Sequence, residues 1–217
     1  MSAREEILSR VRSALVDVTQ PDPALDVPIE WEYGRPTAMP DVLVRFVEMC
    51  EDYKATVVRC SAADVADRIN GLLSAAGVRS VVLPSGVEQA WRQAIEASGI
   101  AVHDDEPPLS RAELDAIDGV VTAAAVGIAE TGTIVLDHAS DQGRRALTLV
   151  PDTHLVVVRA DQVVSDVPEA VVRLAEAVTE GAPLTWISGP SATSDIELSR
   201  VEGVHGPRNL LVVLAGE

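Results

Sequence analysis

Residues 55–84 read ATVVRCSAADVADRINGLLSAAGVRSVVLP, and this stretch decides the fold class. Its two ends, ATVVRC and RSVVLP, are short runs rich in Val, a composition typical of strands. The segment 61–77 between them predicts a helix, because Ser61 offers a capping hydroxyl at its start and Gly77 marks its end. A strand, a helix and a second strand in this order predict a right-handed crossover that joins two parallel strands.

The same alternation continues along the chain. Residues 86–99 predict a helix, 100–104 a strand, 166–181 a further helix and 208–216 a closing strand. Hydrophobic residues make up 47% of the chain and aromatic residues only 3%, so the core is expected to consist of Val, Ile, Leu and Ala, which suits a sheet covered by helices on both faces. We therefore predict an α/β fold with three layers and a mostly parallel, mixed sheet.

One pair of strands is expected to run antiparallel. Residues 120–138, VVTAAAVGIAETGTIVLDH, contain two apolar runs separated by a few polar residues. That separation is too short for a crossover helix, so the two strands should pair as a hairpin. A dinucleotide site is not predicted in the Rossmann-like half of the chain, because G-x-G-x-x-G is missing there and LPSGVE is too short a glycine signal.

The first forty residues form a separate region. Ser2 and Glu5 make a capping box for a first amphipathic helix, and a stretch containing five prolines between 21 and 40 ends it. We predict a division into residues 1–40, the N-terminal helix with its Pro-rich linker, and residues 41–217, the α/β domain. The apolar stripe of the first helix can pack on its own domain or on a second subunit, so a homo-oligomer is one expectation.

Composition excludes several functions. The formal charge is −17 and the Arg residues are scattered, so we expect neither nucleic acid nor an anionic membrane surface as a partner. Cys50 and Cys60 are too few for a zinc or iron–sulfur ligand set, and no metal site or bound cofactor is predicted. The N-terminus lacks the pattern of a secretory signal and no apolar run has membrane length, so the expected location is the cytoplasm.

Two polar clusters interrupt the predicted strands. In the first, Glu130 could act as a nucleophile or base, while Thr131, Gly132 and Thr133 could hold an anion. A turn with Glu130 in solvent and Gly132 at positive φ is the simpler alternative. The second cluster, SGPSATSDIE, follows a predicted strand and offers a possible anion site. Its candidate ligand-binding residues are Gly189, Ser191, Thr193 and Asp195, although Asp195 could equally serve as a helix cap.

Histidines supply further candidates. His205 lies between two glycines in GVHGP and could be an acid, a base or simply a loop residue. His138 and His154 lie near strand ends, where the sequence does not decide which side they face. Ser191, Asp195 and His205 are the ingredients of a hydrolase triad, but the G-x-S-x-G elbow is absent.

Several of these motifs, in this order, resemble one family. IAETGTIVL, LVPDTHLVVV, SGPSATSDIE and VEGVHGP, together with the opening SAREEILSRVRSAL, are similar to the lactate-utilisation protein C family of stand-alone LUD-domain proteins. The resemblance implies a fold like that of ribose-5-phosphate isomerase and the CoA transferases. It also implies a role in bacterial growth on L-lactate, beside iron–sulfur partner proteins that oxidise lactate to pyruvate. Larger LUD relatives carry cysteine clusters that this chain lacks.

Three functions follow as hypotheses. The first is an accessory or substrate-handling subunit of a lactate-oxidising system, in which the loops around Glu130 and Ser191 bind a small anion or a partner. The second, suggested by the fold analogy, is a free-standing enzyme on a CoA thioester or a phosphosugar, with Glu130 as nucleophile. The third is a non-enzymatic regulatory or scaffold protein that docks through its first helix.

Overall fold

The computed structural model describes residues 2–18, 22, 35–193, 201–202 and 206–216. The chain divides into two compact units, Met1–Tyr33 and Gly34–Glu217. The first unit contains helix α1 (Ala3–Ala14), whose capping box joins Ser2 and Glu5 as predicted, and none of its helical residues is buried. The second unit carries the fold described below.

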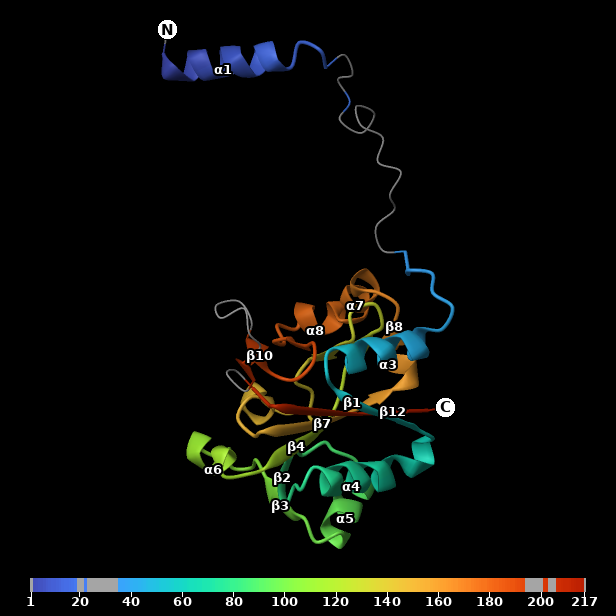
Figure 1. Ribbon diagram of the computed structural model, residues 1–217. Helices are drawn as coiled ribbons and strands as arrows, with labels where there is room; N and C mark the ends of the chain where they lie inside the picture. Colours follow the sequence, from blue (N-terminus) through green and yellow to red (C-terminus); the bar gives the residue numbers. More distant parts are fainter. Residues whose placement is uncertain (1, 19–21, 23–34, 194–200, 203–205, 217) are drawn as a thin grey trace. The chain divides into compact units, whose positions relative to one another are not determined.

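A six-stranded sheet forms the centre of the second unit (Figure 1). Its strand order is β1-β12-β7-β4-β2-β3, and every neighbouring pair is parallel. The strands are β1 (Thr56–Cys60), β12 (Asn209–Ala215), β7 (Thr153–Arg159), β4 (Gly119–Ala123), β2 (Ser80–Leu83) and β3 (Ala101–Asp104). The predicted α/β class is confirmed, and β1 and β2, the two strands of residues 55–84, run parallel in one sheet.

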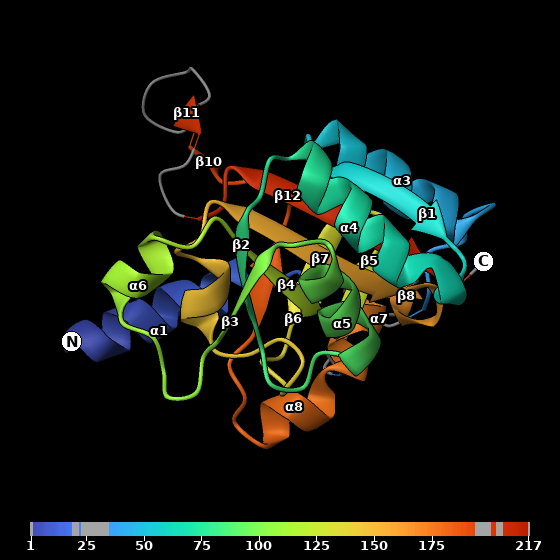
Figure 2. The ribbon, with the colours of Figure 1, turned by 90° about the horizontal axis from the view of Figure 1, so that it is seen from below.

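Helices cover one face of this sheet. α4 (Val65–Ala75) and α5 (Gln89–Ala97) pack there, and Figure 2 shows both of them in front of the strands. Alternate strand residues such as Val121 and Leu155 point into this layer, whereas Val120 and Val156 point to the opposite face. Because both faces are buried, the central strands are mostly apolar, as is typical of parallel sheets, and His154 and Thr122 are buried polar exceptions.

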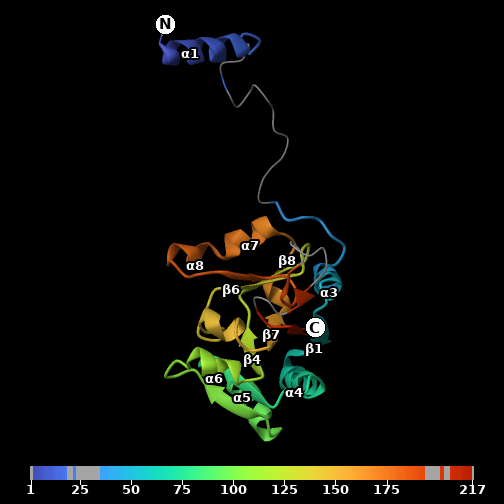
Figure 3. The same ribbon diagram turned by 60° about the vertical axis from the view of Figure 1, so that its left-hand side comes forward.

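A second sheet and further helices lie beyond the opposite face. This sheet has the order β8-β5-β6-β9, and β5 and β6 pair antiparallel as predicted, so strand directions mix here and not in the main sheet. Figure 3 shows α7 and α8 on the outer side of it. The strands are β5 (Val126–Ile128), β6 (Thr133–Leu136), β8 (Val163–Val164) and β9 (Thr185–Ile187), and the helices are α7 (Val167–Arg173) and α8 (Ala175–Thr179).

Shorter elements complete the unit. α3 (Val42–Asp52) packs between the two sheets through Phe46 and Cys50, both fully enclosed in the apolar core. No helix in the described part of the chain is long and apolar enough to span a membrane. The remaining elements are α6 (Arg111–Asp115), the 3-10 helices η1 (Ala62–Asp64), η2 (Arg145–Thr148) and η3 (Ala160–Gln162), and the hairpin of β10 (Ala192–Thr193) with β11 (Val201–Glu202).

Candidate functional site

The Glu-Thr-Gly-Thr turn between β5 and β6 combines an exposed carboxylate with a structural glycine. The side chain of Glu130 is exposed, while its N–H donates to the Ser165 carbonyl at 3.0 Å. Gly132 has φ +58°, and a Cβ there would lie 2.6 Å from the Met49 carbonyl carbon and 2.7 Å from the Cys50 nitrogen. Gly132 therefore allows the turn to lie directly against the C-terminal end of α3.

Hydroxyl groups connect this turn to the strand end at Ser188. Thr131 Oγ1 and Thr133 Oγ1 are 2.8 Å apart, and Thr133 Oγ1 is also 2.8 Å from Ser188 Oγ. This contact follows from the register of the second sheet, in which Ile134 pairs with Ile187. The structure thus brings the first predicted cluster to the beginning of the second.

The second cluster packs on the same helix end. Gly189 has φ +81°, and a Cβ there would lie 2.7 Å from the Tyr53 carbonyl oxygen. The N–H of Ser191 donates to the Pro207 carbonyl at 2.8 Å, so Ser191 lies beside the segment that precedes β12. Thr193 belongs to β10, and its Cα partner is Val201. Asp195 and His205, the remaining members of the predicted site, lie outside the described residues.

A pocket of about 330 Å³ opens beside β9, and we call it the β9 pocket. It contains two of the candidate ligand-binding residues of the second cluster, Gly189 and Ser191, and also Gly206 next to His205. No carboxylate is found among its described lining residues, although the chain carries 34 acidic residues. The lining consists of Arg145, Thr148, Leu149, His154, Thr185, Trp186, Ile187, Ser188, Gly189, Pro190, Ser191, Gly206, Pro207 and Leu210.

Arg145 supplies the positive charge of the β9 pocket. It begins η2, and its side chain is exposed. Within the described part of the structure it makes no ion pair, unlike its neighbour Arg144, which binds Asp105 through two hydrogen bonds of 2.6 and 2.9 Å. An exposed Arg guanidinium that makes no ion pair with the described residues can bind a ligand carboxylate through two parallel hydrogen bonds.

His154 supplies a neutral imidazole. It lies at the start of β7 and is 1% exposed, and burial lowers the pKa of its ring to about 4. Its Nε2 is 2.8 Å from Thr122 Oγ1, and the described residues provide no partner for Nδ1. At neutral pH the ring is therefore uncharged, and one of its nitrogens can form a hydrogen bond with a ligand.

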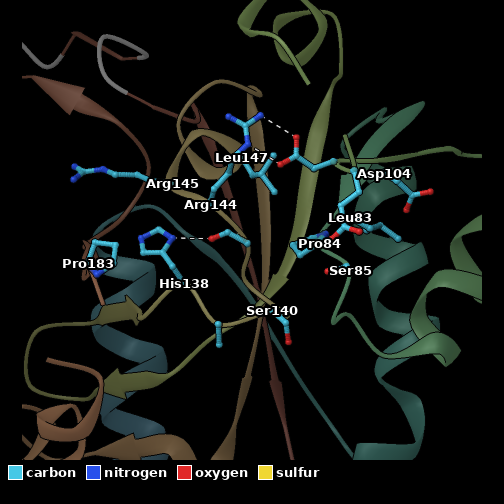
Figure 4. Close-up of a pocket in the computed structure, with 14 residues that line it drawn as sticks. Leu83, Pro84, Ser85, Asp104, His138, Ser140, Arg144, Arg145, Leu147 and Pro183 are labelled. Carbon is cyan, nitrogen blue, oxygen red and sulfur yellow. Dashed lines mark hydrogen bonds and ion pairs between the residues drawn. The ribbon is translucent and has the colours of Figure 1, made fainter. Parts of the chain in front are cut away.

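A larger pocket of about 590 Å³, which we call the β2 pocket, lies at the carboxyl ends of β2 and β3 (Figure 4). It contains Ser85 and three consecutive acidic residues, Asp104, Asp105 and Glu106. Arg145 also lines it, but Figure 4 shows its side chain extending toward the His138 side and away from Asp104. The two pockets therefore share Arg145 and differ in the charge of their walls.

His138 joins the two pockets. Its Nδ1 is 2.8 Å from the Gly143 carbonyl, which can only accept, so Nδ1 carries the proton. In the neutral ring Nε2 is then the acceptor, and it lies 2.8 Å from the hydroxyl of Thr185 in the β9 pocket. The residue holds a left-handed φ of 61°, a conformation that is uncommon for His.

The loop 137–145, DHASDQGRR, is the part of the site that the sequence patterns missed. It provides Arg144 and Arg145, which the sequence did not suggest, and His138, a candidate whose side of the sheet the sequence did not decide. The available signal was a dense run of polar residues directly after a buried strand, with two adjacent arginines in a chain whose other basic residues are scattered.

Comparison with known proteins identifies the family. The model of the LUD domain matches residues 43–215. The chain belongs to the LUD domain family. A Deinococcus radiodurans relative named "Lactate utilization protein C" is 46% identical over 99% of this chain and 96% of its own length. A Geobacillus thermodenitrificans relative of the same name is 26% identical over 85% of this chain and 82% of its own.

A solved structure of a family member agrees with the fold of this LUD chain. The crystal structure of a DUF162 family protein from Deinococcus radiodurans superposes with a TM-score of 0.72 at 45% identity, covering 83% of this chain and all of the other. The resemblance deduced from the motifs is thereby confirmed at the level of family.

Proposed function

We propose that this LUD chain is a substrate-handling subunit of a bacterial L-lactate utilisation system, which binds the 2-hydroxy acid or its 2-oxo acid product in the β9 pocket. The proposal rests on one observation: Arg145 and the neutral His154 line the same small pocket, and no carboxylate is found among its described lining residues. The names of the curated relatives, "Lactate utilization protein C", support the same substrate class.

The chemistry of the pocket fits a small hydroxy acid. The guanidinium of Arg145 would bind the carboxylate of lactate, and hydroxyls such as those of Thr148 and Ser188 would accept or donate the remaining hydrogen bonds. The imidazole of His154 would bond the oxygen at C2, which is a hydroxyl in lactate and a carbonyl in pyruvate. A neutral ring suits both, because the Thr122 hydroxyl can donate to or accept from Nε2, which leaves Nδ1 as a donor in one tautomer and an acceptor in the other.

Electron transfer is assigned to partner proteins. The chain has two cysteines, both buried, whereas an iron–sulfur cluster is usually held by four cysteine thiolates. Oxidation of lactate to pyruvate releases two electrons and two protons, and we propose that iron–sulfur partner subunits take up the electrons. This chain would present the substrate or retain the product.

Calorimetric titration of the full chain tests the binding step. L-lactate and pyruvate should bind, and propionate, which lacks the oxygen at C2, should bind more weakly because a buried hydrogen bond is lost. Arg145→Gln should weaken lactate binding about tenfold or more, whereas Arg111→Gln, at an exposed position on α6 that lines neither pocket, should leave it unchanged. Equal binding by wild type and Arg145→Gln, or no binding by wild type, would remove the β9 pocket as the lactate site.

Growth tests the physiological role separately. A strain without the gene should grow poorly on L-lactate and normally on glucose, and affinity purification from lactate-grown cells should recover proteins with iron–sulfur absorbance. Normal growth on lactate would contradict the proposed role even if lactate binds in vitro.

A further inference from the structure

The β2 pocket lies at the carboxyl ends of β2 and β3, beside the point between β2 and β4 at which the direction of the connections reverses. β2 leads through α5 to β3 on one side, while β4, on the other side of β2, leads to the second sheet beyond the opposite face. The connections thus depart in opposite directions from two neighbouring strands, and ligands of α/β proteins bind in the crevice outside the carboxyl ends at such a point. The pocket is lined there by Leu83 and Ser85 from the end of β2 and by Asp104 from the end of β3.

We propose that the β2 pocket binds a ligand that contains an unphosphorylated ribonucleoside. The ribose hydroxyls of this ligand would donate hydrogen bonds to the carboxylate of Asp104. β2, α5 and β3 form a βαβ unit in which Asp104 ends the second strand and pairs in register with Leu83 at the end of the first. A carboxylate at this place is suited to accept two neighbouring ribose hydroxyls. This site is distinct from the β9 pocket and does not depend on the function proposed for it.

The walls of the pocket match this class of ligand. Leu83, Pro84, Leu147 and Pro183 provide apolar surface for a base, and the volume of about 590 Å³ is far larger than a three-carbon acid requires. In Figure 4 Asp104 and Pro183 lie on opposite sides of the pocket. Asp104 uses Oδ1 to pair with Arg92, and no described contact occupies its Oδ2.

The same region disfavours a diphosphate at the start of α5. Glu88 holds the N-cap position of that helix, where it would repel an anion. The N–H of Gly86 already donates to the Ser140 carbonyl at 2.9 Å, and Ser140 fills the space beside Gly86. The pocket therefore has the ribose-binding carboxylate of a nucleotide site without an open phosphate loop, which agrees with the missing G-x-G-x-x-G motif.

Calorimetry with adenosine and 2′-deoxyadenosine tests the proposal on the full chain. Adenosine should bind at least tenfold more tightly, because the deoxy compound loses a hydrogen bond to a charged acceptor. Asp104→Asn should weaken adenosine binding and bring the two ligands close to equal affinity. Asp67→Asn, an exposed substitution on α4, serves as the control and should keep the wild-type ratio.

A second variant separates ligand binding from the ion pair of Asp104. Arg92→Gln breaks the pair but leaves the carboxylate, so it should retain the preference for the ribose. If Arg92→Gln and Asp104→Asn lose the preference equally, or if wild type binds both nucleosides equally, Asp104 is not a ribose ligand. Failure of adenosine, guanosine, cytidine and uridine alike to bind at millimolar concentration would also overturn the proposal, and it would leave lactate binding in the β9 pocket unaffected.

Discussion

His138 and Thr185 join the loop after β6 to strand β9 through a hydrogen bond of 2.8 Å between Nε2 and Oγ1. Thr185 is 8% exposed, and the opposite ring nitrogen is held by the Gly143 carbonyl. Because the histidine backbone is left-handed at this point, the contact holds an unfavourable conformation in place. Both candidate pockets depend on the position of this loop.

We expect Thr185→Val to lower the free energy of unfolding by about 1 kcal/mol, since it removes one hydroxyl without changing the shape of the side chain. His138→Asn should lower the free energy of unfolding by about 1–2 kcal/mol. Asn tolerates a left-handed φ, so this loss measures the two hydrogen bonds of the imidazole ring. Urea denaturation of both single variants and the double variant measures the coupling. The double variant should be less destabilised than the two single effects added together, and strict additivity would show that the contact carries no energy.

Gly132 should tolerate no side chain. Gly132→Ala adds a methyl group that meets the backbone of Met49 and Cys50, so it should destabilise the domain by about 3 kcal/mol or more. Gly77 is a matched control, since its φ of +70° is similar but a Cβ there meets nothing within 4 Å. Gly77→Ala should therefore cost only about 1 kcal/mol, the strain of the left-handed backbone alone. Similar losses at the two positions in thermal or chemical unfolding would contradict the close packing of the turn on α3.

His154 should make the stability of the protein depend on pH. The folded state holds its pKa at about 4, below the ordinary 6.5, so the unfolded chain binds a proton more readily between these values. The stabilisation is present above pH 6.5 and is lost progressively as the pH falls toward 4. We expect a loss of about 2 kcal/mol from this residue between pH 6.5 and pH 5.

Urea denaturation at these two pH values measures the His154 effect. His154→Gln keeps a polar group beside Thr122 but cannot titrate, so its free energy of unfolding should change less than that of wild type over the same range. An equal change in the two proteins would assign the pH dependence to other groups. His103→Gln, at an exposed position in β3, is the control and should behave like wild type.

Asp166 should contribute two separable stabilising interactions. Its Oδ1 accepts from the Glu169 N–H and caps α7, while Oδ2 accepts from both the N–H and the hydroxyl of Thr37 at 2.9 and 2.8 Å. Asp166→Asn can keep the cap but offers Thr37 a donor in place of an acceptor, whereas Asp166→Ala loses both interactions. We expect Asp166→Ala to cost about 1–2 kcal/mol more than Asp166→Asn in chemical denaturation. Equal losses would show that the cap adds nothing.

The sequence by itself determined most elements of this protein and its family, although the helix predicted over 166–181 is divided into α7 and α8 and the first apolar run of 120–138 into β4 and β5. Strand and helix signals in residues 55–84 depend on local patterns, so the parallel βαβ units could be predicted. The short spacing between the two apolar runs around Gly132 predicted the antiparallel pair of β5 and β6. The capping box at Ser2 is likewise local, because donor and acceptor lie three residues apart. Motif order alone indicated the LUD family.

Only the tertiary structure decided which polar residues meet. Thr133 and Ser188 are 55 positions apart, and His138 and Thr185 are 47 apart, so their contacts depend on strand register and not on any local pattern. The same packing leaves the side chain of Glu130 in solvent and places Gly132 directly against the backbone of α3. It also brings Arg145 into the lining of both pockets. Burial of His154, which sets its charge, likewise follows from the layers packed around β7, since desolvation is a property of the assembled core and not of the residue.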